Sequence, residues 1–431
     1  MPPTAQDSGS ADQSVLGHYD GYDRQTSQRY FDIVASARQH CPVAHSAAHG
    51  GYWIVTAHAD IRRILSDPET FSNANGIMIP VEDRLRKPPQ DLDPPLQTDF
   101  RRLLNRYFSR HGLARHAERS RELAAAQVAA ILPLGDRAVG GPGCDIIADF
   151  AKPLTAAVLS TVILDLRDPD RFTQMAALVA RISKGSAEDN SRAFRTLQDA
   201  VDELLGTLSD REDRDDVLNA VLRGTVASRP LTHDEQVGTI MQLLLGGLKT
   251  TVAAIGHIVA SIAQDEVPED RLRQPDWSAS YLDEFLRYES PVKMIARMVT
   301  REVMIGGREL RVGDMVAVML PSANRDDAMF EHPDELDLAR RNNPHLAFGL
   351  GVHRCIGSNL ARLEIATAID ALLARVRNVG LVPGTVLTRT PSASELSWEA
   401  VPVQFDLAGG ATAKPSASTR SGRVSTTGPF G

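Results

Sequence analysis

The sequence predicts a helix-dominated α+β protein that folds as one large domain. A continuous helical pattern runs from Thr232 to about Asp265, short strand-like segments lie on either side of it, and no break in composition divides the middle of the chain. A chain of 431 residues has room for two or three average domains. Because enzymes with a single large core reach this size, we expect one domain over residues 17–408.

The long helical pattern predicts the central element of the fold. Thr232 and Glu235 stand three residues apart and form a capping box, which marks the first turn. A helix from there to about Asp265 would be roughly 50 Å long at about 1.5 Å per residue. Because it is apolar on nearly all sides, we expect it to cross the middle of the molecule.

A second helix is predicted over residues 358–376, where apolar residues recur at helical spacing. Strand-like segments lie at residues 51–56, 303–311, 314–320 and, in a proline-rich region, 391–405. Both ends of the chain, residues 1–16 and 409–431, are polar and lack periodicity. We expect these two ends to be disordered.

The composition is typical of a soluble globular protein, with 42% hydrophobic and 24% charged residues. A net charge of -8 and a pI of about 5.9 make nucleic acid an unexpected partner. The N-terminal stretch is polar, and no uninterrupted run of about 18 apolar residues occurs, so we expect no membrane segment. The three cysteines are widely spaced, which indicates a reducing compartment. We therefore expect a cytoplasmic monomer.

A glycine-punctuated loop from Phe348 to Gly357 presents Cys355 just before the second predicted helix. Unpaired N–H groups and the helix dipole stabilise a thiolate at such a position, and the glycines allow the backbone to pass close to a flat ring. We interpret Cys355 as the thiolate ligand of a haem iron, which favours O–O bond cleavage and therefore oxygen activation. The alternatives are a buried structural cysteine and a zinc site, but no second Cys or His pair stands at ligand spacing.

The loop resembles the haem-binding signature of the cytochrome P450 family. The matching positions are Phe348, Gly349, Gly351, His353, Cys355 and Gly357. The resemblance implies the cytochrome P450 fold, a helix-rich single domain with small β-sheets and a long central helix over the haem. It also implies haem b (iron protoporphyrin IX) as the cofactor, with Phe348, Gly349, His353 and Gly357 beside it.

The middle of the central helix, from Gly246 to Thr251, is similar to the oxygen-activation motif of the same family. The adjacent Gly246 and Gly247 each cost about 1 kcal/mol in a helix, which suggests that something approaches the backbone there. The resemblance implies that the hydroxyl group of Thr250 passes protons during oxygen activation. The alternative is a threonine that only bonds back to its own helix carbonyl.

Lys249 departs from the family pattern, which has Asp or Glu at this position. An ammonium donates hydrogen bonds but accepts none. Three roles stay open: a pair with an acid such as Glu284 or Asp265, proton transfer by Lys249 itself, or slower proton delivery with loss of reducing equivalents to peroxide. Our hypothesis is that water and Thr250 sustain oxygen activation with altered coupling. We count Lys249, with the two glycines, among the catalytic candidates.

Two further groups of residues match supports for the haem. Glu284 and Arg287 form the family's ExxR pair, and Arg340 supplies the third member; we expect these three to be structural. The resemblance implies that the haem propionates contact basic or polar side chains. These are Gln97, Arg101, Arg297 and His353.

No nucleotide fingerprint and no four-cysteine cluster occurs, so electrons must come from separate proteins. We expect a ferredoxin and an NAD(P)H-dependent ferredoxin reductase. A group of arginines near Cys355 would attract an acidic ferredoxin, although a solvated surface is nearly as good an interpretation. The group consists of Arg101, Arg102, Arg106, Arg110, Arg354 and Arg362.

By family position, the substrate pocket is mainly apolar, which favours a small or medium hydrophobic substrate. Its predicted lining consists of Met78, Ile79, Leu245, Met294, Ile295 and Leu396, and Lys293 is a possible anchor for a carboxylate. The leading hypothesis is a monooxygenase that hydroxylates or oxidatively demethylates its substrate with one oxygen atom from O2. The alternatives are a peroxide-driven peroxygenase and a non-catalytic haem-thiolate sensor or carrier.

Overall fold

The structure is a computed structural model, and it describes residues 15–81, 85–164, 166, 169–182, 187–208 and 214–408. Leu16, which falls within the N-terminal segment predicted to be disordered, is buried against the core. The rest of that segment and residues 409–431 lie outside the described residues.

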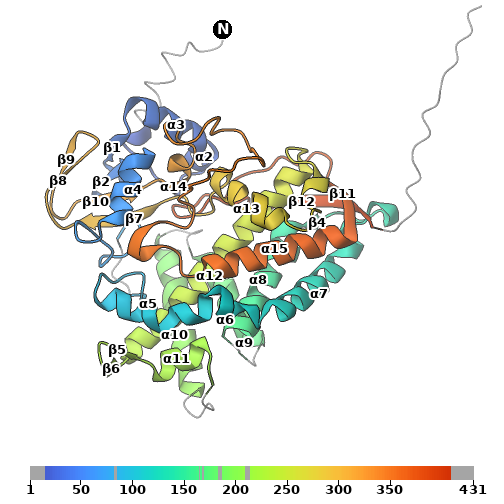
Figure 1. Ribbon diagram of the computed structural model, residues 1–431, viewed down its shortest axis with the longest axis horizontal. Coiled ribbons are helices and arrows are strands. Elements are labelled where there is room, and N and C mark those ends of the chain that lie inside the picture. The colour runs from blue at the N-terminus through green and yellow to red at the C-terminus, as the bar shows by residue number, and fades with distance from the viewer. Residues whose placement is uncertain are drawn as a thin grey trace, which may run out of the picture.

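The molecule has a sheet-rich part and a larger helical part (Figure 1). The α-helices are α2 (Arg24–Gln28), α3 (Tyr30–His40), α4 (His58–Ser66), α5 (Leu96–Phe108), α6 (Arg110–Ala114), α7 (Ala117–Gly135), α8 (Lys152–Val158), α9 (Pro169–Arg181), α10 (Ala187–Thr207), α11 (Val217–Arg223), α12 (His233–Ala263), α13 (Trp277–Tyr288), α14 (Leu320–Ala323) and α15 (Ser358–Arg375). The predicted helix-dominated α+β fold is confirmed.

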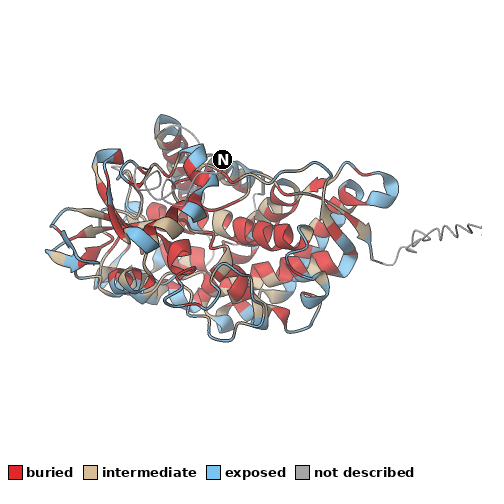
Figure 2. Cartoon of the chain, turned by 90° about the horizontal axis from the view of Figure 1, so that it is seen from above, coloured by how far each residue is buried: buried red, intermediate tan, exposed pale blue. Residues whose placement is uncertain are grey.

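Helix α12 is the central helix that the sequence predicts, and α15 packs against it. The side chain of Thr232 caps its first turn, and Glu235 completes the capping box. Most residues of its middle and C-terminal half are buried, and Figure 2 shows buried residues concentrated along the helices in the interior. The segments Ile146–Ile163 and His233–Ala263 are long and apolar enough to cross a membrane, but both are mostly buried inside the fold, as core helices are.

The sheet-rich part is built on a five-stranded sheet in the order β1-β2-β10-β7-β3. The strands are β1 (Val43–Ser46), β2 (Tyr52–Val55), β3 (Phe71–Ser72), β4 (Cys144–Asp145), β5 (Thr225–Val226), β6 (Arg229–Pro230), β7 (Ile295–Val299), β8 (Val303–Ile305), β9 (Arg308–Leu310), β10 (Met315–Val318), β11 (Val376–Leu381) and β12 (Pro402–Leu407). Strand β2 pairs in parallel with β10, so two of the predicted strands lie side by side. The segment predicted over 303–311 is the hairpin of β8 and β9.

The predicted closing strand over residues 391–405 is correct only at its end, where β12 begins at Pro402. Before it, residues 389–398 form an irregular hairpin, here called the 389–398 hairpin, joined by the bridge between Arg389 and Trp398. A bidentate ion pair between Arg389 and Glu289 fastens its base at 2.8 and 2.9 Å. Near its tip, the buried ammonium of Lys293 donates to the carbonyl of Ser392 at 2.8 Å.

Candidate active site around Cys355

The loop before α15 opens onto a cavity of about 700 Å³, here called the main cavity. The backbone N–H of Cys355 donates to the carbonyl of Phe348 at 2.8 Å, which closes the loop. Gly351 has a φ of +70°, and a Cβ there would lie 2.4 Å from the carbonyl oxygen of Leu65, so only glycine fits. At Gly349, with a φ of +66°, a side chain would point into open space, which leaves that side of the cavity free.

The side chain of Cys355 is exposed to the main cavity, whereas Cys144 is buried in the core. Cys355 lies two residues before Gly357, the N-cap of α15, and so at the positive end of the helix dipole. Burial raises the pKa of the Cys355 thiol, while the backbone N–H of Gly357 and nearby arginines lower it. A metal cation at the sulfur would favour the thiolate further.

Hydrogen-bond donors line the main cavity on the side of His353. The Nε2 atom of His353 is buried and has no hydrogen-bond partner among the described residues. Burial lowers the pKa of His353 to about 4, so the ring is neutral at pH 7 and one nitrogen can donate. Arg101 and Arg297 also line the cavity, and burial lowers the pKa of Arg297 to about 10. A sulfur ligand, an open wall at Gly349 and these donors fit a flat metallocycle with carboxylate arms, which is haem.

The other predicted neighbours of the haem, Phe348 and Gly357, also line the main cavity, but Gln97 does not. Gln97 is buried, and its side-chain amide donates to the carbonyl of Val352 at 2.6 Å. It therefore holds the backbone of the cysteine loop instead of facing the cavity. The sequence could not reveal this, because the loop that occupies its hydrogen bond lies far along the chain.

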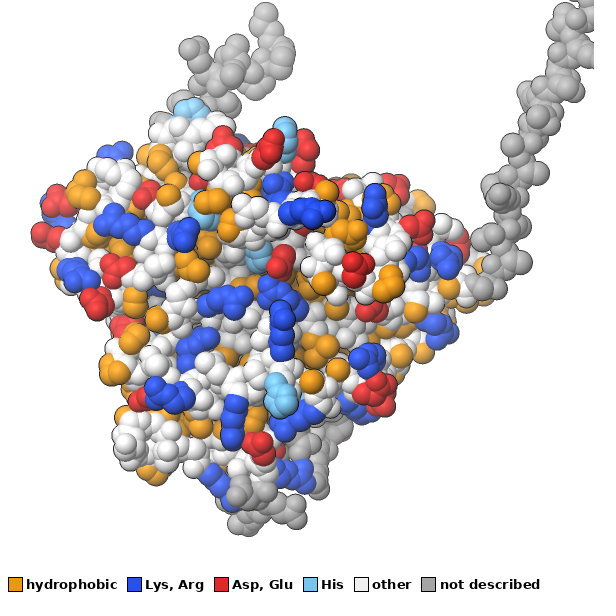
Figure 3. Space-filling view, in the orientation of Figure 1, with side chains coloured by type: hydrophobic (Ala, Val, Ile, Leu, Met, Phe, Trp, Pro, Cys, Tyr) orange, Lys and Arg blue, Asp and Glu red, His pale blue; other side chains and the backbone are white. Residues whose placement is uncertain are grey.

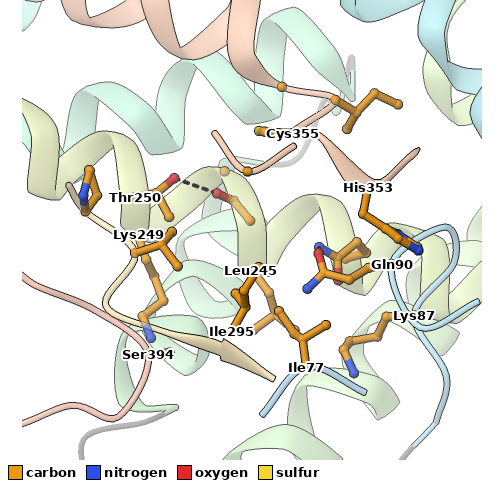
Figure 4. Close-up of a pocket in the computed structure, with 18 of the residues that line it drawn as sticks. Ile77, Lys87, Gln90, Leu245, Lys249, Thr250, Ile295, His353, Cys355 and Ser394 are labelled. Atoms are coloured by element: carbon orange, nitrogen blue, oxygen red, sulfur yellow. Dashed lines mark hydrogen bonds between the residues drawn. The ribbon is translucent and has the colours of Figure 1, made fainter. Parts of the chain in front are cut away.

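The centre of α12 faces the main cavity with Gly246, Gly247 and Thr250. The hydroxyl group of Thr250 donates to the carbonyl of Gly246 at 2.9 Å, the bond drawn as a dashed line in Figure 4. This is the local hydrogen bond considered above as an alternative. It occupies the hydroxyl hydrogen but leaves the lone pairs of Oγ1 able to accept, so both roles are compatible.

Lys249 pairs with neither of the acids suggested by the sequence, Glu284 and Asp265. Its ammonium forms an ion pair with Glu395 of the 389–398 hairpin and donates to the carbonyl of Ile182 at 3.1 Å. Asp265 follows the C-terminal end of α12, and the carboxylate of Glu284 forms ion pairs with Arg287 and Arg340. The partner was missed because the fold alone brings the hairpin against α12.

Glu364 of α15 is a cavity-lining residue that the sequence interpretation missed. Its side chain is buried and hydrogen-bonds to Thr251, the neighbour of Thr250. Burial raises the pKa of Glu364 to about 8, so the carboxyl group holds a proton at pH 7. The sequence signal was an acid within the apolar pattern of residues 358–376, and because Asp370 is a second one, the pattern alone did not single out Glu364.

The predicted cluster of Glu284, Arg287 and Arg340 lies outside the main cavity and is almost completely buried. Arg287 donates to both carboxylate oxygens of Glu284 at 2.8 Å, and Arg340 donates to the same group at 3.0 Å. The remaining N–H groups of Arg287 donate to three backbone carbonyls, at Asn324, Pro333 and Glu335. The cluster thus ties α13 to the segment that leads to the cysteine loop.

Four of the six predicted substrate contacts line the main cavity: Met78, Leu245, Met294 and Ile295. Ile79 and Leu396 do not, because both are buried in the core of the N-terminal part. Met78 and Glu395, which directly precede these two residues in the chain, do line the cavity, and so do Ile77 and Ser394. Lys293 is also excluded from the cavity, where it was considered as an anchor. Burial lowers its pKa to about 7, and Gly21, Ser27 and Ser392 accept its hydrogen bonds.

Comparisons with known proteins agree on one family. The family model described as Cytochrome P450 matches residues 279–393. The probable cytochrome P450 127A1 of Sinorhizobium fredii is 33% identical over 338 residues, 78% of this chain and 79% of that protein. Nocardicin C N-oxygenase of Nocardia uniformis subsp. tsuyamanensis is 33% identical over 339 residues, 75% of this chain and 81% of that protein.

Solved structures agree with the sequence relatives. Cytochrome P450 CYP109Q5 from Chondromyces apiculatus matches with a TM-score of 0.78 at 25% identity, covering 91% of this chain and 99% of that chain. CYP108D1 from Novosphingobium aromaticivorans matches in fold with a TM-score of 0.79 at 23% identity, covering 95% of this chain and 100% of that chain. The chain is therefore an enzyme of the cytochrome P450 family of oxidoreductases.

Proposed function

We propose that the protein is a haem-thiolate monooxygenase that inserts one oxygen atom from O2 into a small or medium, mainly hydrophobic substrate. The proposed reaction is hydroxylation or oxidative demethylation, and the proposed cofactor is haem b. The observation that carries the proposal is the meeting of Cys355, Thr250 and the unpaired His353 in one cavity. The proposal depends on this arrangement of a sulfur ligand, a hydroxyl group and a hydrogen-bond donor around one cavity.

Haem, when bound, supplies the redox chemistry that activates dioxygen. Cys355 would hold the iron through its sulfur, and Arg101, Arg297 and His353 would hold the carboxylates. Thr250 would accept a hydrogen bond at Oγ1 and donate a proton on the cavity side when its bond to Gly246 breaks. The apolar side chains of the lining exclude bulk water from the reacting region.

The chemistry of the cavity wall supports a neutral substrate. Apolar residues such as Leu245 and Ile295 lie below Thr250 in Figure 4, whereas the ammonium groups of Lys87 and Lys249 are each paired with a carboxylate. Both lysines among the described residues of the wall therefore already have a carboxylate partner.

We infer that a separate ferredoxin and NAD(P)H-dependent reductase supply the electrons to a soluble, cytoplasmic monomer. Lys and Arg side chains gather over α5 and the loop before α15 on the face shown in Figure 3. Arg102, Arg106, Arg110 and Arg354 of the predicted group are exposed. An acidic ferredoxin would be attracted to this surface on an otherwise acidic protein.

The test uses a ligand first identified by its effect on the Soret band of the haem protein. Turnover under 18O2 with ferredoxin, reductase and NADPH should place one labelled atom in the product, and Thr250→Ala should lower the product formed per NADPH consumed. Thr250→Ser is the control, because it keeps the hydroxyl group. Product formed with hydrogen peroxide but not with the electron-transfer proteins would show that the protein is a peroxygenase. No turnover with either would show that it is a haem-thiolate sensor or carrier.

A further inference from the structure

The Lys249–Glu395 pair is a charged element in an otherwise apolar part of the main cavity. Both side chains line the cavity, with 11% of the Lys249 side chain and 9% of the Glu395 side chain exposed. Burying two charges is expensive, and an apolar pair of similar size is often as stable or more stable. Stability alone therefore does not explain why two charges occupy this wall.

The pair is not saturated with hydrogen bonds. Lys249 uses its N–H groups on Glu395 and on the carbonyl of Ile182, and no third acceptor lies in the part of the chain that the structure describes. The Oε2 atom of Glu395 likewise accepts no hydrogen bond within the described ranges. One donor and one acceptor therefore remain side by side at the cavity wall.

The position of the pair suits the recognition of a substrate. Figure 4 shows Lys249 and Ser394 together on one side of the cavity, Lys87 and Gln90 on the other, and Leu245 and Ile295 between them. Cys355 lies across the cavity from Lys249 in the same view. A molecule with a polar group at the Lys249–Glu395 pair would lay its apolar body over Leu245 and Ile295, in the space that Cys355 faces from the other side.

We propose that the Lys249–Glu395 pair is the substrate-recognition site for a neutral group that both donates and accepts hydrogen bonds, a hydroxyl or an amide, on an otherwise apolar substrate. The pair carries no net charge, so it favours such a group over a carboxylate, which would compete with Glu395 for Lys249. This inference rests on the proposed function, because binding is judged at the haem site. The pair positions the substrate and does not itself react.

The test compares ligands of one rigid shape: adamantane, 1-adamantanol and 1-adamantanecarboxylate. Dissociation constants are measured from the shift of the Soret band in the parent protein and in Lys249→Met/Glu395→Leu, which keeps the wall filled. A hydrogen bond to a charged group is stronger than one between neutral groups, and a tenfold change in affinity corresponds to about 1.4 kcal/mol. We expect the preference for the alcohol over the hydrocarbon to fall about tenfold in the double variant, with the carboxylate binding more weakly than the alcohol to the parent.

Two further variants separate recognition from a general change in the cavity. The charge exchange Lys249→Glu/Glu395→Lys restores a donor beside an acceptor and should retain the preference for the alcohol. Lys87→Met removes the ammonium on the opposite side and should also retain it. An unchanged preference in Lys249→Met/Glu395→Leu, a loss of preference in Lys87→Met, or tightest binding of the carboxylate would overturn the inference. A parent protein without the thiolate-type carbonyl spectrum would instead overturn the proposed function.

Discussion

Glu364 links a single buried side chain to the pH dependence of stability. Its pKa is raised from 4.5 to about 8 by burial, so the folded protein keeps a proton that the unfolded chain releases above pH 4.5. The free energy of unfolding should therefore fall as the pH rises from 4.5 to 8. Glu364→Gln should flatten this part of the curve and be more stable than the parent protein at pH 8, as measured by urea unfolding.

The control for this prediction is the comparison near pH 4.5, where the two proteins should differ least. Parallel curves for the parent and Glu364→Gln across the whole range would show that the carboxyl group titrates normally in the folded protein.

Single residues also show where prediction from the sequence stops. Roles for Cys355 and Thr250 could be predicted because each lies inside a local motif. The partner of Lys249 and the orientation of Ile79 depend on which distant segment packs against them, and local spacing carries no such information. Leu396 was misassigned for the same reason: it packs into the core, while Ser394 and Glu395 just before it line the main cavity.

At the scale of elements, Gly246 lowers the stability of α12 but leaves room in the main cavity. A Cβ at Gly246 would meet only the side-chain amide of Gln242, at 3.6 Å, so alanine fits without a clash. Because alanine is favoured over glycine in a helix, Gly246→Ala should raise the free energy of unfolding by about 0.5–1 kcal/mol. The added methyl group enters the main cavity, so ligand affinity measured at the Soret band should fall. Unchanged affinity would mean that ligands do not approach this turn of α12.

The Glu284–Arg287–Arg340 cluster joins α13 to the segment before the cysteine loop. Arg287 makes five hydrogen bonds from a fully buried guanidinium, and the ammonium of a lysine cannot reproduce that planar arrangement. We expect Arg287→Lys to lower the free energy of unfolding by about 3–5 kcal/mol in urea titrations. Arg102→Lys, at an exposed pair with Asp99, is the control and should change it by less than about 1 kcal/mol. A loss as small as in the control would contradict a structural role for the cluster.

At the scale of the whole molecule, the charge distribution predicts how electrons arrive. Arg102 and Arg106 are exposed, although each contacts a carboxylate, so the arginine surface is only partly neutralised. The rate of haem reduction by an acidic ferredoxin should fall steeply as ionic strength rises, because salt screens exposed charges. Reversing the charge in Arg354→Glu should weaken this salt dependence. A flat salt response in the parent protein would contradict docking at this surface.

The overall architecture was largely predictable, because it depends on long periodic patterns. The capping box fixed the start of α12, and the apolar spacing after Cys355 gave α15. The 389–398 hairpin was not predictable, since it is held by an ion pair to Glu289 and by Lys293 instead of by a regular strand pattern. The site is built from periodic helices and from the irregular 389–398 hairpin. Its helical motifs were therefore recognised from the sequence, whereas part of its lining was not.

The central claim is that the sulfur of Cys355 binds the haem iron, and the carbonyl adduct of the reduced protein tests it most directly. We expect the parent protein, Cys41→Ala and Cys144→Ala to show the red-shifted Soret band that marks thiolate ligation, and Cys355→Ala to lack it. Absence of that band from the parent protein, or its survival in Cys355→Ala, would contradict the account.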